Sequence, residues 1–108
     1  MKPPSVGELK HRITFRRTIE SRGADGSVIE SQVTLTSAWA RMIPLSGSEK
    51  FAAQGVSAST VYEIWVRWFS GLTPQDDFIL GDREFDIQGL RNYDENNRWW
   101  VITATEGV

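Results

Sequence analysis

The chain of 108 residues contains no cysteine. Disulfides, thiolate nucleophiles, zinc–thiolate sites and iron–sulfur clusters are therefore excluded together. There is one histidine, His11, so a histidine-based zinc site or catalytic pair lacks its second member. We interpret His11 as a structural side chain and predict no metal site and no cofactor.

Long hydrophobic runs and a strong net charge are also missing. No stretch approaches the roughly 18 apolar residues of a membrane-spanning helix, and the first ten residues do not resemble a secretory signal. The net charge of −2 provides no overall positive field that would attract nucleic acid. Hydrophobic residues make up 40% of the chain and charged residues 24%, which is typical of one soluble globular domain. We expect residues 1–108 to form that domain, with residues 1–8 as a flexible arm.

What the sequence does contain is apolar residues recurring with a period of two, the pattern of strands with one buried face. Turn signals rich in Gly, Pro, Asp and Asn separate most of these runs. The pattern predicts an all-β fold, a small six-stranded antiparallel barrel or sandwich. The expected strands cover residues 9–20, 33–43, 60–69, 77–80, 83–90 and 99–106.

A long connection between the second and third strands, residues 45–59, breaks this alternation. Ser48 is predicted to cap one short helix over residues 49–54, and Gly55 to end it. A connection of this length inside a small domain is more often functional than idle.

No arrangement of residues in the chain is typical of catalysis. The adjacent carboxylates Asp76-Asp77 and Asp94-Glu95 lie in or beside turns, where we expect them to be solvated. The glycine-rich stretches do not match a phosphate-binding loop. We therefore predict that the protein is not an enzyme.

The polar face of the first strand carries three cations, Lys10, Arg12 and Arg16. Cations beside aromatic residues can hold single-stranded nucleic acid, and they can equally form a protein interface. Because the chain as a whole is acidic, we favour an ordinary solvated face or a protein interface over nucleic-acid binding. A small β-barrel that binds single-stranded nucleic acid is retained as the alternative.

Five tryptophans are many for a core of this size. Trp39, Trp68 and one member of the pair Trp99-Trp100 are expected in the core. Trp65, next to Arg67, and the other member of the pair are expected on outer faces. Exposed aromatic side chains usually mark contact with another protein, so we predict that Trp65 and Arg67 contribute to an interface.

In the order and spacing of its motifs, the sequence resembles the head–tail joining, or head-completion, proteins of tailed bacteriophages. The resemblance covers GELKHRITF at 7–15, TSAWARMIPLSGSEKFAA at 36–53, EIWVRW at 63–68 and the closing segment at 71–107. It implies a virion structural protein, assembled in the bacterial host cytoplasm, that has no enzymatic activity. Such proteins form a ring below the portal and adaptor, close the DNA-filled head and provide the surface for tail attachment.

The resemblance also implies partners: portal or adaptor proteins, tail-completion or tail proteins, and further copies of the chain. Contact with packaged DNA is expected to be non-specific, no membrane is involved, and a monomeric isolated chain would be compatible with this role. A ring requires two different, complementary surfaces on each subunit. We predict the basic face with Lys10 and Arg12 as one surface and Asp94-Glu95 as the other.

In relatives, the long connection can project into the channel and help to retain the genome. The corresponding candidate residues are Gly47, Ser48, Glu49, Lys50, Phe51 and Gln54.

Overall fold

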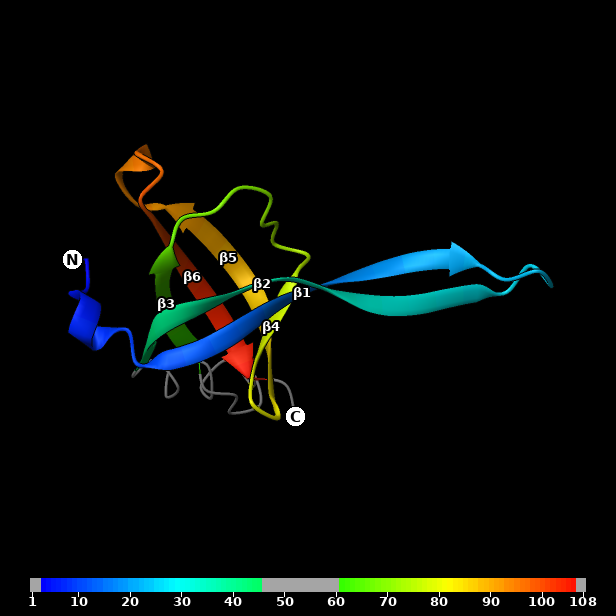
Figure 1. Cartoon of the computed structure of the whole chain (residues 1–108), viewed down its shortest axis with the longest axis horizontal. Coiled ribbons are helices and arrows are strands. Elements are labelled where there is room, and N and C mark those ends of the chain that lie inside the picture. The colour runs from blue at the N-terminus through cyan, green and yellow to red at the C-terminus, as the bar shows by residue number, and fades with distance from the viewer. Residues whose placement is uncertain (1–2, 46–60, 107–108) are drawn as a thin grey trace, which may run out of the picture.

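The structure, a computed structural model, describes residues 3–45 and 61–106 and is built from six antiparallel strands (Figure 1). The sheet closes on itself in the order β1-β2-β3-β6-β5-β4, forming a barrel. This confirms the prediction of an all-β, six-stranded fold. The strands are β1 (His11–Arg22), β2 (Val28–Pro44), β3 (Val61–Arg67), β4 (Asp77–Leu80), β5 (Arg83–Asn92) and β6 (Trp99–Glu106), with 3-10 turns η1 (Val6–Glu8) and η2 (Tyr93–Glu95).

The core fills the inside of the barrel with aromatic and branched side chains that alternate along the strands, as the period of two predicts. Phe78 and Phe85 stack with ring centroids 4.9 Å apart, and Phe15 packs against Phe78 at 5.6 Å. Each fully buried side chain of this size contributes about 1.5–3 kcal/mol of hydrophobic stabilisation. The buried members of this cluster are Ile13, Phe15, Ala40, Ile64, Val66, Leu72, Phe78, Phe85, Ile87, Ile102 and Ala104.

The inward face of β2 differs from the prediction. Ala40 is fully buried, whereas Trp39, expected in the core, is 51% exposed. A bulge explains the difference, because Phe15 pairs with Thr36 and Arg16 pairs with Thr34, which leaves Leu35 without a partner on β1. One extra residue in β2 exchanges its two faces, so strict alternation through residues 33–43 assigns the wrong face beyond the bulge.

Part of the N-terminal segment, for which a flexible arm over residues 1–8 is predicted, has a defined local structure. Val6–Glu8 forms η1, and Ser5 and Glu8 form a capping box at its start. Glu8 also forms an ion pair with Arg41 (Nε to Oε2, 3.3 Å). The cap satisfies backbone groups that a free turn would leave to water, and the ion pair with Arg41 on β2 connects η1 to the barrel.

A two-stranded arm, comprising residues 18–33, extends from the barrel (Figure 1). β1 pairs with β4 only over Thr14–Arg16, and β2 pairs with β3 only from Ala40 onward. Between these limits and the turn, β1 and β2 pair only with each other, and every arm residue except Gly23 is exposed. The chain reverses between Arg22 and Val28, and β2 begins at Val28, before the predicted start at residue 33.

The helix predicted over residues 49–54 lies outside the described residues, and so do the candidate channel residues. In the ranges that the structure does describe, no helix is long and apolar enough to cross a membrane.

Candidate interaction surfaces

An aromatic cluster covers the outside of the barrel over β3 and β6. Trp65, Trp99 and Val101 point away from the core but are buried, and Trp65 is only 1% exposed. Tyr93 lies with its ring centroid 5.1 Å from that of Trp65, and Leu9 packs against the same cluster. Trp65 is therefore on an outer face, as predicted, but the prediction that it is exposed for contact is wrong. The covering residues come from η2 and the N-terminal segment, which strand alternation does not reveal.

In the pair Trp99-Trp100, one tryptophan packs on the core and the other lies on an outer face, as predicted. Trp100 points inward and donates its indole N–H to the carbonyl oxygen of Phe69 (2.8 Å), while Trp68 stacks on it. Trp99 points outward, and the guanidinium of Arg67 lies 4.6 Å from its ring centroid. Arg67 is exposed and covers Trp99, so any partner that binds here meets the arginine first.

Trp39 is the exposed aromatic side chain among the described residues. Together with Val6 and Leu9 it lines a groove of about 270 Å³, and Val6 is 76% exposed. The Arg12 guanidinium lies 5.5 Å from the Trp39 ring centroid, a cation–π arrangement worth about 0.5–1 kcal/mol at an exposed site. We call this surface the N-terminal groove. Strand alternation places its tryptophan in the core and therefore misses it.

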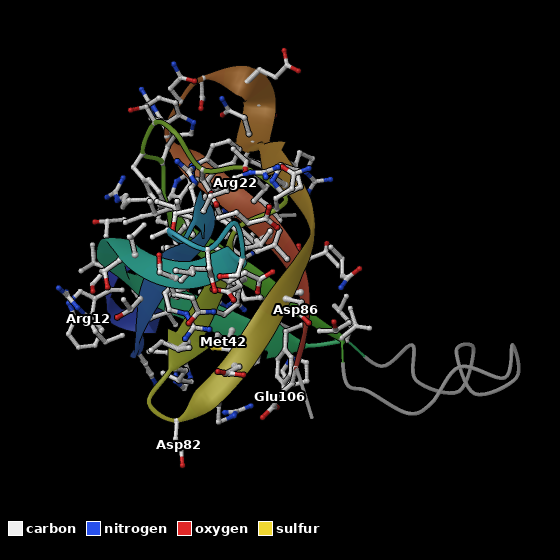
Figure 2. All side chains as sticks on the ribbon, turned by 90° about the vertical axis from the view of Figure 1, so that its right-hand side faces the viewer. Arg12, Arg22, Met42, Asp82, Asp86 and Glu106 are labelled. Atoms are coloured by element: carbon white, nitrogen blue, oxygen red, sulfur yellow. The ribbon has the colours of Figure 1, made fainter. Side chains whose placement is uncertain are left out.

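Of the three predicted interface cations, Lys10 just before β1 and Arg12 and Arg16 on it, two are available to a partner. Lys10 and Arg12 are exposed, and Figure 2, which looks toward the arm, shows Arg12 pointing outward at the side of the barrel. Arg16 instead forms a bidentate ion pair with Asp77 (3.0 and 3.1 Å) on the neighbouring β4. Arg16 therefore serves the fold, and the basic surface consists of Lys10 and Arg12.

A second arginine–aspartate pair holds the base of the arm. Arg17 donates two hydrogen bonds to Asp76 (2.8 and 2.9 Å) and a third to the Gly71 carbonyl oxygen. Burial of Asp76 opposes its ionisation, but the bonds from Arg17 and from the Thr73 amide prevail and lower the pKa of the carboxyl. The prediction of a solvated Asp76 is wrong, because this carboxylate is 3% exposed and fixes β1 to the segment before β4.

A third arginine–carboxylate ion pair lies where β5 begins. Arg83 donates to both carboxylate oxygens of Glu106 (2.9 and 3.0 Å) and to the hydroxyl of Tyr62 (3.1 Å). These bonds raise the pKa of Arg83 and lower the pKa of Glu106. Strands β3, β5 and β6 are thus linked by one charged network at this rim.

Asp94 and Glu95 are exposed, as predicted, at the tip of the turn between β5 and β6. Both adopt left-handed backbone angles (φ 53° and 50°), and Asn92 and Asn97 form side-chain hydrogen bonds across the turn. Their neighbour Tyr93 packs on the same outer cluster as Leu9. The acidic turn and the N-terminal groove are therefore joined through this cluster, while the arm extends toward the opposite end of the molecule (Figure 1).

The described surfaces also bear on metal binding and on nucleic-acid binding. The described part of the chain holds no group of three or more His, Asp or Glu side chains that could bind a metal ion. Binding of a single strand uses several exposed aromatic rings along a basic groove. The described residues provide one such ring, Trp39, and Arg12 partly covers it.

Comparison with known proteins agrees with this picture. The family model for the phage head completion protein matches residues 4–107. A protein from Shigella flexneri 2a, solved in solution, has the same fold, with a TM-score of 0.72 and 20% identity over 97% of this chain and 98% of its own. A chain of the native gene transfer agent virion aligns with a TM-score of 0.70 and 23% identity over 92% of this chain and 94% of its own. No curated protein matches in sequence.

Proposed function

Because the chain belongs to the phage head completion protein family, a family of structural virion proteins and not of enzymes, we propose that it is a ring-forming subunit of the head–tail connector. In this role a ring of subunits lies below the portal or adaptor, closes the DNA-filled head and presents the surface to which the tail attaches. The observation that carries the proposal is the family match over residues 4–107, nearly the whole chain.

The surface of the molecule supports this role. A ring subunit contacts its two neighbours through two different surfaces. The chain has separate features of this kind, an exposed basic pair at Lys10 and Arg12, the N-terminal groove, and an arm that no described residue outside β1 and β2 covers. The acidic turn at Asp94-Glu95 is a further candidate, for the neighbour or for a portal or tail protein.

The proposal predicts that the basic pair is needed for assembly and not for folding. Reversing both charges, Lys10→Glu with Arg12→Glu, should abolish ring formation on the portal, since both side chains are exposed and form no ion pair in the described residues. Circular dichroism should show an unchanged β fold. Asp82→Lys, at the exposed tip of the β4–β5 hairpin, is the control and should assemble normally. Heads and tails that join normally in the double variant would refute this role for the basic pair.

The channel role of the long connection stays a prediction. It concerns residues 47–54, and it can be tested independently of the ring by asking whether filled heads keep their DNA when this segment is shortened.

A further inference from the structure

One face of the arm is apolar and exposed. Residues that pair directly across two strands point to the same face, so the pairs Arg17–Val33, Ile19–Ser31 and Ser21–Ile29 lie together. On this face Ile19 is 43% exposed, Ile29 50% and Val33 38%. We call these three side chains the arm stripe. The stripe continues the core-facing side of β1, which runs through Ile13 and Phe15 before it leaves the barrel.

The arm is poorly stabilised by its own contacts. A two-stranded ribbon in water is marginally stable, and its sheet neighbours β3 and β4 do not reach residues 18–33. On the reverse face Glu20 pairs directly with Glu30, and like charges in this position are destabilising. An ordered ribbon with an exposed apolar stripe and a repulsive acidic pair is therefore suited to a partner that covers the stripe and supplies positive charge.

The opposite end of the molecule has this complementary chemistry. The N-terminal groove of Val6, Leu9 and Trp39 is apolar; the Arg12 guanidinium lies over its tryptophan, and Lys10 follows Leu9 in the chain. The molecule is 51 Å along its longest axis, with η1 near one end and the arm at the other (Figure 1). Val6 is held in place by the cap of η1 and by the Glu8–Arg41 pair, so the groove is formed before any partner arrives.

The charges of the two ends are also opposite. The arm carries three carboxylates, Glu20, Asp25 and Glu30, against one cation, Arg22. The N-terminal end carries three cations, Lys10, Arg12 and Arg41, against one carboxylate, Glu8. Complementary charge steers association and fixes orientation, while burial of the apolar groups supplies most of the affinity.

We propose that the arm of one copy lies on the N-terminal groove of the next copy, with the arm stripe against Val6 and Trp39, so that the net negative arm lies beside the net positive N-terminal end. A contact between two different ends of identical molecules is heterologous, and it closes into a ring when the rotation between copies allows. The inference rests on the proposed ring and names the surfaces that build it.

Cysteine cross-linking tests this contact directly, because the chain has no cysteine of its own. A variant with both Val6→Cys and Ile29→Cys, incorporated into particles and treated with a flexible bismaleimide, should give a ladder of covalent oligomers. A ladder requires each copy to be linked to two neighbours through different residues. Either single variant should give no ladder. The matched control pairs Val6→Cys with Asp82→Cys, at the exposed tip of the β4–β5 hairpin (Figure 2), and should also give none.

Other outcomes contradict the proposal in distinct ways. Dimers from Ile29→Cys alone would show that two arms meet each other, and linkage of the Ile29→Cys variant to a portal or tail protein would identify a different occupant. A different result is particles that contain the double variant in normal amounts, with both cysteines accessible to the reagent, but that give no ladder. This result would overturn the arm contact and leave the connector role intact. Particles made with the unchanged chain that do not contain it would overturn the connector role itself, and the arm contact with it.

Discussion

At the residue scale, Trp65 and Trp39, two of the three outward-facing tryptophans in the described residues, have opposite roles. Trp65 is 1% exposed beneath Tyr93 and Trp99, so Trp65→Ala should lower the free energy of unfolding by about 3–5 kcal/mol. Trp39 is 51% exposed, so Trp39→Ala should cost less than about 1 kcal/mol, mainly the contact with Arg12. Urea titrations of the two isolated variants provide the comparison. Equal losses in both would contradict the assignment of Trp65 to the fold and Trp39 to a contact surface.

Asp76 gives stability a defined dependence on pH. Its pKa in the folded state lies below the ordinary 3.8, so its contribution is complete above that value and is lost as pH falls through the folded pKa. Asp76→Asn should therefore reduce the free energy of unfolding by a constant amount, about 1–3 kcal/mol, between pH 7 and pH 5. Below about pH 3.8 the difference from the unchanged protein should shrink.

Denaturant unfolding at a series of pH values checks this dependence. Glu84→Gln is the control, since Glu84 is exposed and its contact with Arg16 is long, at 3.7 Å. Its effect should stay within about 0.5 kcal/mol. A difference for Asp76→Asn that grows as the pH falls would contradict the predicted sign.

At the scale of elements, the strands and their order along the chain could be predicted, and two features could not. The period of two locates all six strands, because each has one face on the core. The bulge at Leu35 is invisible to that pattern, and it sends Trp39 outward while Ala40 faces the core. The cover over Trp65 comes from Tyr93 and Leu9, which are distant in sequence and fall outside the strand repeat.

The candidate surfaces follow the same division. Exposure of Lys10, Arg12, Asp94 and Glu95 could be predicted, since each lies on a polar face or in a turn. The pairing of Arg16 with Asp77 could not, because it depends on β4 lying beside β1, which is set by barrel closure and not by local sequence. The length of the arm was likewise hidden, since its stripe looks like an ordinary core face.

The arm is expected to be the least protected strand pair of the barrel in the isolated chain. Its amides are bonded only across one ribbon, and local opening needs no disruption of the core. Hydrogen exchange followed by mass spectrometry should show exchange over residues 18–33 that is much faster than in β3 and β6. In assembled particles the same residues should become protected, because a neighbour covers the stripe. Unchanged exchange on assembly would argue that the arm remains free.

At the scale of the whole molecule, Ile19→Ser with Ile29→Ser separates folding from assembly. Both side chains are about half exposed, so the melting temperature should change little. Ring formation should be lost, because the arm stripe no longer supplies apolar area. Thr103→Ser, on the exposed face of β6, is the control and should behave as the unchanged chain does. Rings that form normally from the double variant would count against the arm contact.

The family match, the closed six-stranded fold and the surfaces left uncovered together describe a molecule suited to assembly and not to turnover. The most direct test is to produce particles from a genome that lacks this chain and then add the purified protein back. We predict DNA-filled heads and free tails in its absence, seen by electron microscopy, and joined particles after its addition. Complete, tailed particles that retain their DNA without the chain would contradict the account.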